Sequence, residues 1–138
     1  MKTLFLLSFL TFGLVACQPS NPPPAMSIEK ASARAPLPGQ STAVVYFDIV
    51  NHGGEDTLLS ATSNVSSRVE LHDHIHEDGV MKMRQVNNVA IPAKDRVSFQ
   101  SGGLHVMLFN VEGDEPYLLT LDFETHEDIT IQILPNIN

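Results

Sequence analysis

The sequence predicts an all-β domain of about nine strands, built as a sandwich or barrel, and two features carry this prediction. Short apolar or alternating runs rich in Val, Ile and Phe recur at close spacing, and turn-forming residues separate them. After residue 25, no run repeats apolar residues at the i, i+3, i+4, i+7 spacing of an amphipathic helix. We therefore expect a β-sandwich or barrel rather than alternating strands and helices. The order of the strands cannot be read from these runs.

The expected strands follow one another along the chain with a recognisable break after most of them. They are MSIEKASAR (26–34), STAVVYFDIVN (41–51), TLLSAT (57–62), SRVELH (67–72), GVMKMR (79–84), RVSFQ (96–100), LHVMLFN (104–110), YLLTLDF (117–123) and DITIQIL (128–134). The breaks that carry turn residues are NHGGED, EDG, IPAKD, SGG and EGDEP. Gly, Pro, Asn and Asp adopt turn conformations readily, so each of these breaks is expected to end a strand.

The first 25 residues are not expected to belong to the folded domain. The segment MKTLFLLSFLTFGLVAC has one Lys near its start and an apolar run that stops at Cys17, which is typical of a secretory signal. The last four of these residues, LVAC, resemble a bacterial lipobox. We expect a signal peptide over 1–16, a lipidated Cys17 opening a Pro-rich tether over 17–25, and one domain over 26–138. The alternative is an ordinary cleaved signal with an incidental cysteine.

The expected location and the charge limit the partners of the domain. A lipidated Cys17 predicts a lipoprotein on the periplasmic side of a bacterial membrane, and Gln18 in place of Asp favours the outer membrane. The formal net charge of −8 argues against binding nucleic acid, which requires basic surface. Cys17 is the only cysteine, so the domain must be stabilised by an apolar core rather than by disulfides.

Histidine and methionine residues crowd into one stretch, VELHDHIHEDGVMKMR. The metal-binding side chains alternate along it, as His72, His74, His76, Met81 and Met83. Alternate residues of a strand share a face, and a four-residue HEDG loop would place His74 opposite Met81. The same register would place His72 opposite Met83, close enough for both to reach one ion. The alternative is that the Met residues fill the core and the His residues face solvent.

A second pair of potential ligands, His105 and Met107, follows an SGG turn in the sequence GGLHVMLF. These two residues would project to one side of a strand near its start. The alternative is a half-buried strand with an incidental histidine. Mixed thioether and imidazole ligands without thiolate suit Cu(I) better than Zn²⁺, Mg²⁺ or Ca²⁺. His52 and His126 are expected in surface turns, without a ligand role.

The spacing of four of these residues resembles that of a known family. His72, Met83, His105 and Met107 form the pattern H-x10-M-x21-H-x-M. Together with ELH, GVMKMR, IPA and GGLHVML, this pattern resembles the PCuAC-type periplasmic copper(I) chaperones over about residues 26–134. The resemblance implies a cupredoxin-like Greek-key β-sandwich. It also implies that these four side chains bind Cu(I) at one end of the barrel.

The resemblance further implies a copper carrier for the dinuclear centre of cytochrome c oxidase. Cytochrome c oxidase subunit II or a thiol-bearing Sco-like assembly factor would be the acceptor.

His74, His76 and Met81 offer a second site, where the imidazoles would hold Cu(II) or Zn²⁺. Alternatively these histidines face solvent, or His74 replaces a ligand during copper exchange.

Three other functions compete with a copper carrier. The first is a lipoprotein that sequesters copper for tolerance. The second is a metalloenzyme, which we do not expect because thioether ligands weaken the Lewis acidity that hydrolytic metal sites need. The third is a structural lipoprotein that binds no metal. A blue-copper site is excluded, because it needs a Cys thiolate and the only cysteine is the expected lipidation site.

Overall fold

The computed structural model describes residues 22–136, which fold into eleven β-strands without a helix. The expected signal peptide and Cys17 lie outside the described residues. In the described part of the chain, no helix has the length and apolarity needed to cross a membrane. The prediction of an all-β domain is confirmed.

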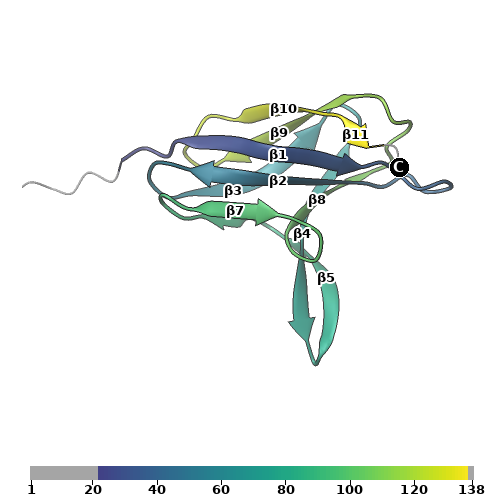
Figure 1. The fold of residues 1–138 in the computed structure, drawn as a ribbon, viewed down its shortest axis with the longest axis horizontal. Helices are drawn as coiled ribbons and strands as arrows, with labels where there is room; N and C mark the ends of the chain where they lie inside the picture. The colour runs from purple at the N-terminus through teal and green to yellow at the C-terminus, as the bar shows by residue number, and fades with distance from the viewer. Residues whose placement is uncertain (1–21, 137–138) are drawn as a thin grey trace, which may run out of the picture.

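The strands alternate with short turns along the whole domain (Figure 1). They are β1 (Met26–Arg34), β2 (Ala43–Asn51), β3 (Asp56–Ser63), β4 (Arg68–Glu77), β5 (Val80–Val86), β6 (Val89–Ile91), β7 (Arg96–Phe99), β8 (His105–Phe109), β9 (Tyr117–Phe123), β10 (Ile129–Ile133) and β11 (Pro135–Asn136). The prediction of nine strands missed β6 and β11, which are only three and two residues long.

Two sheets enclose the hydrophobic core. The larger sheet has the order β11-β1-β2-β8-β4-β5, with β7 also pairing to β2, and the smaller sheet has the order β10-β9-β3-β6. Phe47 of β2 stacks on Phe99 of β7 with ring centroids 4.5 Å apart. Both rings are buried, as are Leu119 and Leu121 of the smaller sheet. The face of the larger sheet that does not meet this core is therefore available for polar side chains.

The β4–β5 hairpin extends away from the sandwich (Figure 1). Its turn is Asp78-Gly79, with φ angles of 54° and 75°. Two successive positive φ values are the signature of a two-residue type I′ turn, which matches the twist of the strands it joins. The predicted four-residue HEDG loop is therefore wrong, because Glu77 already pairs with Val80.

This turn changes the partners of the hairpin residues but not their faces. His74 pairs with Met83 and His76 pairs with Met81, while His72 lies opposite Gln85. The observed register differs from the predicted one by two residues. Because side chains alternate with a period of two, each of these residues stays on the face on which it was expected.

The last residues of the expected tether lie against the domain. The amide of His52 donates to the carbonyl of Ala25 at 2.8 Å, and the amide of Gly54 donates to that of Pro23 at 3.2 Å. A Cβ atom at Gly53 would lie 2.1 Å from the Pro23 carbonyl oxygen. Glycine at this position thus allows the segment 22–25 to pack closely on the loop that follows β2.

Candidate metal centre

The potential ligands lie on the outer face of the larger sheet. Along β8, His105 and Met107 alternate with Val106 and Leu108, which are fully buried in the core. His105 and Met107 therefore point away from the core. His72 of β4 pairs directly with His105, which places it on the same outer face.

His105 is the centre of this group and is only 3% exposed. Its Nδ1 lies 2.8 Å from the carbonyl oxygen of Gly103, and its Nε2 lies 3.1 Å from Sδ of Met83. A carbonyl oxygen can only accept, so Nδ1 carries the proton of the neutral ring and Nε2 has a free lone pair. Burial lowers the pKa of His105 further below neutrality, which favours this neutral form.

The contact between His105 and Met83 therefore joins two atoms that both carry lone pairs. With the proton of the neutral ring on Nδ1, no hydrogen lies between Nε2 and the thioether sulfur. Two such atoms in contact gain little from each other but are well placed to share a soft cation. This pair is the feature of the outer face that most clearly indicates metal binding.

Two further imidazole rings approach His105 from β4. The ring of His72 lies 5.8 Å from that of His105 between centroids, and the ring of His74 lies 5.1 Å away. Nδ1 of His74 is 3.3 Å from the Gly103 carbonyl, so this oxygen accepts from two histidines. His74 was expected only as a secondary ligand, yet it lies at least as near the centre as His72. The Asp-Gly pair in the sequence was the signal for this register.

Strand register places Met107 beside this group. It lies two residues from His105 along β8 and faces Glu70 across the β4–β8 ladder. Its side chain is half-buried and shares the outer face with His72 and His105. Of the four ligands expected from the family resemblance, three are thus brought together by close contacts and Met107 by its place in the ladder.

The expected second site lies farther out on the hairpin. His76 and Met81 form the cross-strand pair next to His74 and Met83, nearer the turn. Met81 is 51% exposed, and His76 is exposed as well. Across residues 22–136, no three His, Cys, Asp or Glu side chains are grouped so as to hold an ion. His52 and His126 lie in the loops after β2 and β9.

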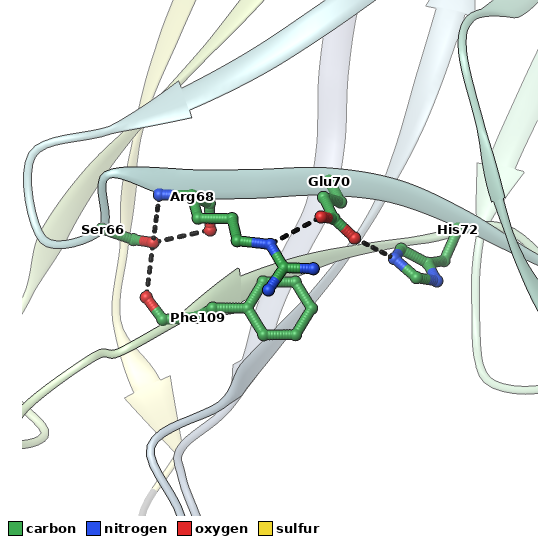
Figure 2. Close-up of polar contacts among 5 residues, drawn as sticks. All are labelled: Ser66, Arg68, Glu70, His72 and Phe109. Atoms are coloured by element: carbon green, nitrogen blue, oxygen red, sulfur yellow. Dashed lines mark hydrogen bonds and ion pairs between the residues drawn. The ribbon is translucent and has the colours of Figure 1, made fainter.

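Glu70 of β4 is a member of the site that sequence analysis did not assign. One carboxylate oxygen lies 2.8 Å from Nε2 of His72, and the other accepts from Nε of Arg68 at 2.7 Å (Figure 2). The guanidinium of Arg68 rests 4.2 Å above the ring of Phe109. The hydrogen bonds from His72 and Arg68 lower the pKa of Glu70, so this side chain is a carboxylate at neutral pH. The other ring nitrogen of His72, Nδ1, is buried and has no partner in the described structure.

Solved structures of copper-binding domains resemble this fold. The copper-bound PCuAC domain from PmoF2 is 25% identical, with a TM-score of 0.67 over 82% of this chain and 93% of that domain. The apo PCuAC domain from PmoF1 is 22% identical, with a TM-score of 0.67 over 82% and 94% of the two chains. The Cu(I) form of DR1885 from Deinococcus radiodurans is 21% identical, with a TM-score of 0.66 over 86% and 83%. The prediction of a cupredoxin-like β-sandwich is confirmed by these matches.

Comparisons of sequence lead to lipoproteins. "Putative lipoprotein Lxx21020" of Leifsonia xyli subsp. xyli (strain CTCB07) is 27% identical over 96 residues, which are 68% of this chain. The match covers 57% of that protein, so the chain spans little more than half the length of this relative. The family model described as "Putative lipoprotein LpqE-like" matches residues 26–135, which is nearly the whole of the described domain. The chain therefore belongs to the LpqE-like lipoprotein family, and its domain has the fold of PCuAC domains.

Proposed function

We propose that this protein is a lipoprotein that binds Cu(I) and passes it to an acceptor protein. His72, Met83, His105 and Met107 are the proposed ligands. The observation that carries the proposal is the 3.1 Å contact between Nε2 of His105 and Sδ of Met83, two potential ligand atoms. The contact of His105 Nδ1 with the Gly103 carbonyl assigns the ring proton to Nδ1 and leaves a lone pair on Nε2. Imidazole with thioether, in the absence of thiolate, is a ligand set that favours Cu(I). The likeness to the copper-bound domain from PmoF2 supports copper as the metal.

The different burial of the ligands favours transfer over permanent storage. Met83 is 44% exposed on the projecting hairpin, whereas His105 is 3% exposed. An acceptor can therefore approach the ion from the side of Met83 while His105 still holds it. Neutral ligands bind Cu(I) less strongly than thiolates do, so an acceptor with Cys ligands takes the ion by stepwise exchange.

In our proposal, His74 is a temporary ligand during this exchange. It lies directly opposite Met83 and its ring is 5.1 Å from that of His105. It is thus placed to bind the ion when Met83 gives way to a ligand of the acceptor. His76 and Met81, one pair nearer the turn, extend the row of potential ligands toward solvent.

We propose a lipid anchor at Cys17 and a place on the periplasmic side of a bacterial membrane. The membership of the LpqE-like lipoprotein family supports the anchor. The proposed acceptors are thiol-bearing proteins, such as a Sco-like assembly factor or subunit II of cytochrome c oxidase. We propose no enzymatic activity, because thioether ligands reduce the Lewis acidity of a bound ion.

Replacing Met83 by alanine tests the proposed ligand set, and Met81→Ala is the matched control. Both methionines lie on one face of β5 and both are about half exposed, but only Met83 contacts His105. The full-length chain in detergent is titrated with Cu(I) against a chromogenic Cu(I) chelator. We expect Met83→Ala to lower the affinity about 10- to 100-fold and Met81→Ala to lower it less than about threefold. Equal losses in the two variants, or no loss in either, would contradict the proposal.

A further inference from the structure

His72 and His105 use opposite ring nitrogens for their protein hydrogen bonds. His105 donates from Nδ1 to the Gly103 carbonyl, which leaves Nε2 with a lone pair. In His72 it is Nε2 that lies 2.8 Å from an oxygen of Glu70, while Nδ1 is buried and has no hydrogen-bond partner within residues 22–136. The centroids of the two rings are only 5.8 Å apart, so two neighbouring histidines of one site present different ring nitrogens.

The contact with Glu70 determines which nitrogen of His72 carries the proton. A carboxylate accepts hydrogen bonds and cannot donate them, so Nε2 must be the donor. The neutral ring then has its lone pair on Nδ1.

The position of Glu70 is itself fixed by its neighbours (Figure 2). Its second oxygen accepts from Arg68, whose guanidinium rests on the ring of Phe109. The backbone of Arg68 is held in turn by Ser66, whose hydroxyl accepts from the Arg68 amide at 3.2 Å. The side chains of Glu70 and His72 are each only 12% exposed, so water competes weakly for their hydrogen bond.

We infer that Glu70 is a positioning residue, which holds the Nε2–H of His72 and thereby presents Nδ1 to Cu(I). This inference rests on the proposed Cu(I)-binding function and adds the residue and ring nitrogen through which His72 acts. Histidines that bind metals commonly donate their other ring N–H to a carboxylate or carbonyl, which fixes the ring and its tautomer. His72 and His105 both follow this rule, with Glu70 and Gly103 as the respective acceptors. The ion is therefore bound by Nδ1 of one histidine and by Nε2 of the other.

The structure argues against an opposite role, in which Glu70 blocks Nε2 and must release it before copper binds. Release would leave the Glu70 carboxylate, at 12% exposure, with Arg68 as its remaining partner. Release would also leave the buried Nδ1 of His72 without a hydrogen-bond partner from the described part of the chain. Binding through Nδ1 satisfies that atom and keeps both hydrogen bonds of Glu70.

The tautomer of His72 can be measured by NMR on the full-length chain in detergent, labelled with 15N at histidine. Long-range 1H–15N correlations distinguish protonated from unprotonated ring nitrogens, and His72→Gln identifies the His72 signals. Without copper, we expect His72 to carry its proton on Nε2. One equivalent of Cu(I) should shift the Nδ1 resonance of His72 and leave Nε2 protonated.

Substitutions of Glu70 complete the test. Glu70→Ala should give a mixture of His72 tautomers and lower the Cu(I) affinity about 10- to 100-fold. Glu70→Gln retains a carbonyl acceptor and should recover most of this loss. The control is Glu29→Ala, which removes a carboxylate that pairs with Arg96 at 2.9 Å and, among the described residues, has no hydrogen bond to a histidine. It should change neither the tautomer nor the affinity.

The outcomes separate this inference from the function on which it rests. If the wild-type chain binds Cu(I) but His72 carries its proton on Nδ1, or if Cu(I) shifts Nε2, the positioning role of Glu70 is wrong and the proposed function stands. Equal affinities of Glu70→Ala and Glu29→Ala would also overturn the positioning role alone. If the wild-type chain binds no Cu(I), both fail.

Discussion

Replacing His105 by alanine is expected to lower the Cu(I) affinity of the protein by more than about 100-fold, more than any loss that a positioning residue causes. His105 contacts Met83 directly, and the rings of both His72 and His74 lie next to its own. Its removal takes away one ligand and leaves the sulfur of Met83 without its neighbour. Competition with a chromogenic Cu(I) chelator measures the loss.

His126→Ala is the matched control for this substitution. His126 also uses Nδ1 in a contact with a backbone carbonyl, that of Glu127 at 2.6 Å, but it lies in the loop after β9. The His126→Ala variant should bind Cu(I) as tightly as the wild-type chain. Circular dichroism should show that both variants remain folded as β-sandwiches. Wild-type affinity in a folded His105→Ala variant would rule out the proposed centre.

Replacing Phe47 by alanine is expected to cause the largest loss of stability. Phe47 is 1% exposed and stacks on Phe99 between the two sheets, so truncation leaves a large cavity in the core. The expected decrease in the free energy of unfolding is about 3–5 kcal/mol. Urea titration followed by circular dichroism measures it.

The control for Phe47→Ala is Leu118→Ala on the smaller sheet. Leu118 is 45% exposed, so its truncation should cost less than about 1 kcal/mol. Copper binding should weaken together with stability in Phe47→Ala, because the neighbouring Tyr46 lies 6.5 Å from His105 between ring centroids. Similar losses of stability in the two variants would mean that the core does not lie where the structure places it.

The sequence predicted the strands that have their own apolar pattern and missed those that exist only through pairing. β6 and β11 are too short to show a period of two, and their hydrogen bonds to β3 and β1 arise from the tertiary fold. The hairpin register was wrong because the predicted HEDG loop included Glu77, which pairs with Val80. The Asp-Gly pair, which forms the two-residue turn, was present in the sequence.

The sequence predicted which side of each strand carries the candidate ligands, but it did not predict all of their side-chain contacts. Alternation along the strands placed His72 with Met83 and, separately, His105 with Met107, and the family resemblance joined the two pairs. The two-residue change of register in the hairpin kept His72 and Met83 on the expected face. The contacts of Glu70 with Arg68 and His72 join alternate residues of β4, so the R-x-E-x-H pattern of residues 68–72 was a local signal for them. The contact of Arg68 with the ring of Phe109 had no such signal, because it requires β4 and β8 to be neighbours.

The most direct test of the copper centre is X-ray absorption spectroscopy at the copper edge on the full-length chain loaded with one equivalent of Cu(I). Thioether and imidazole ligands together should give both sulfur and nitrogen scatterers in the first coordination shell. The sulfur contribution should decrease in Met83→Ala and remain unchanged in Met81→Ala. A first shell of nitrogen and oxygen alone in the wild-type chain would contradict the proposed ligand set.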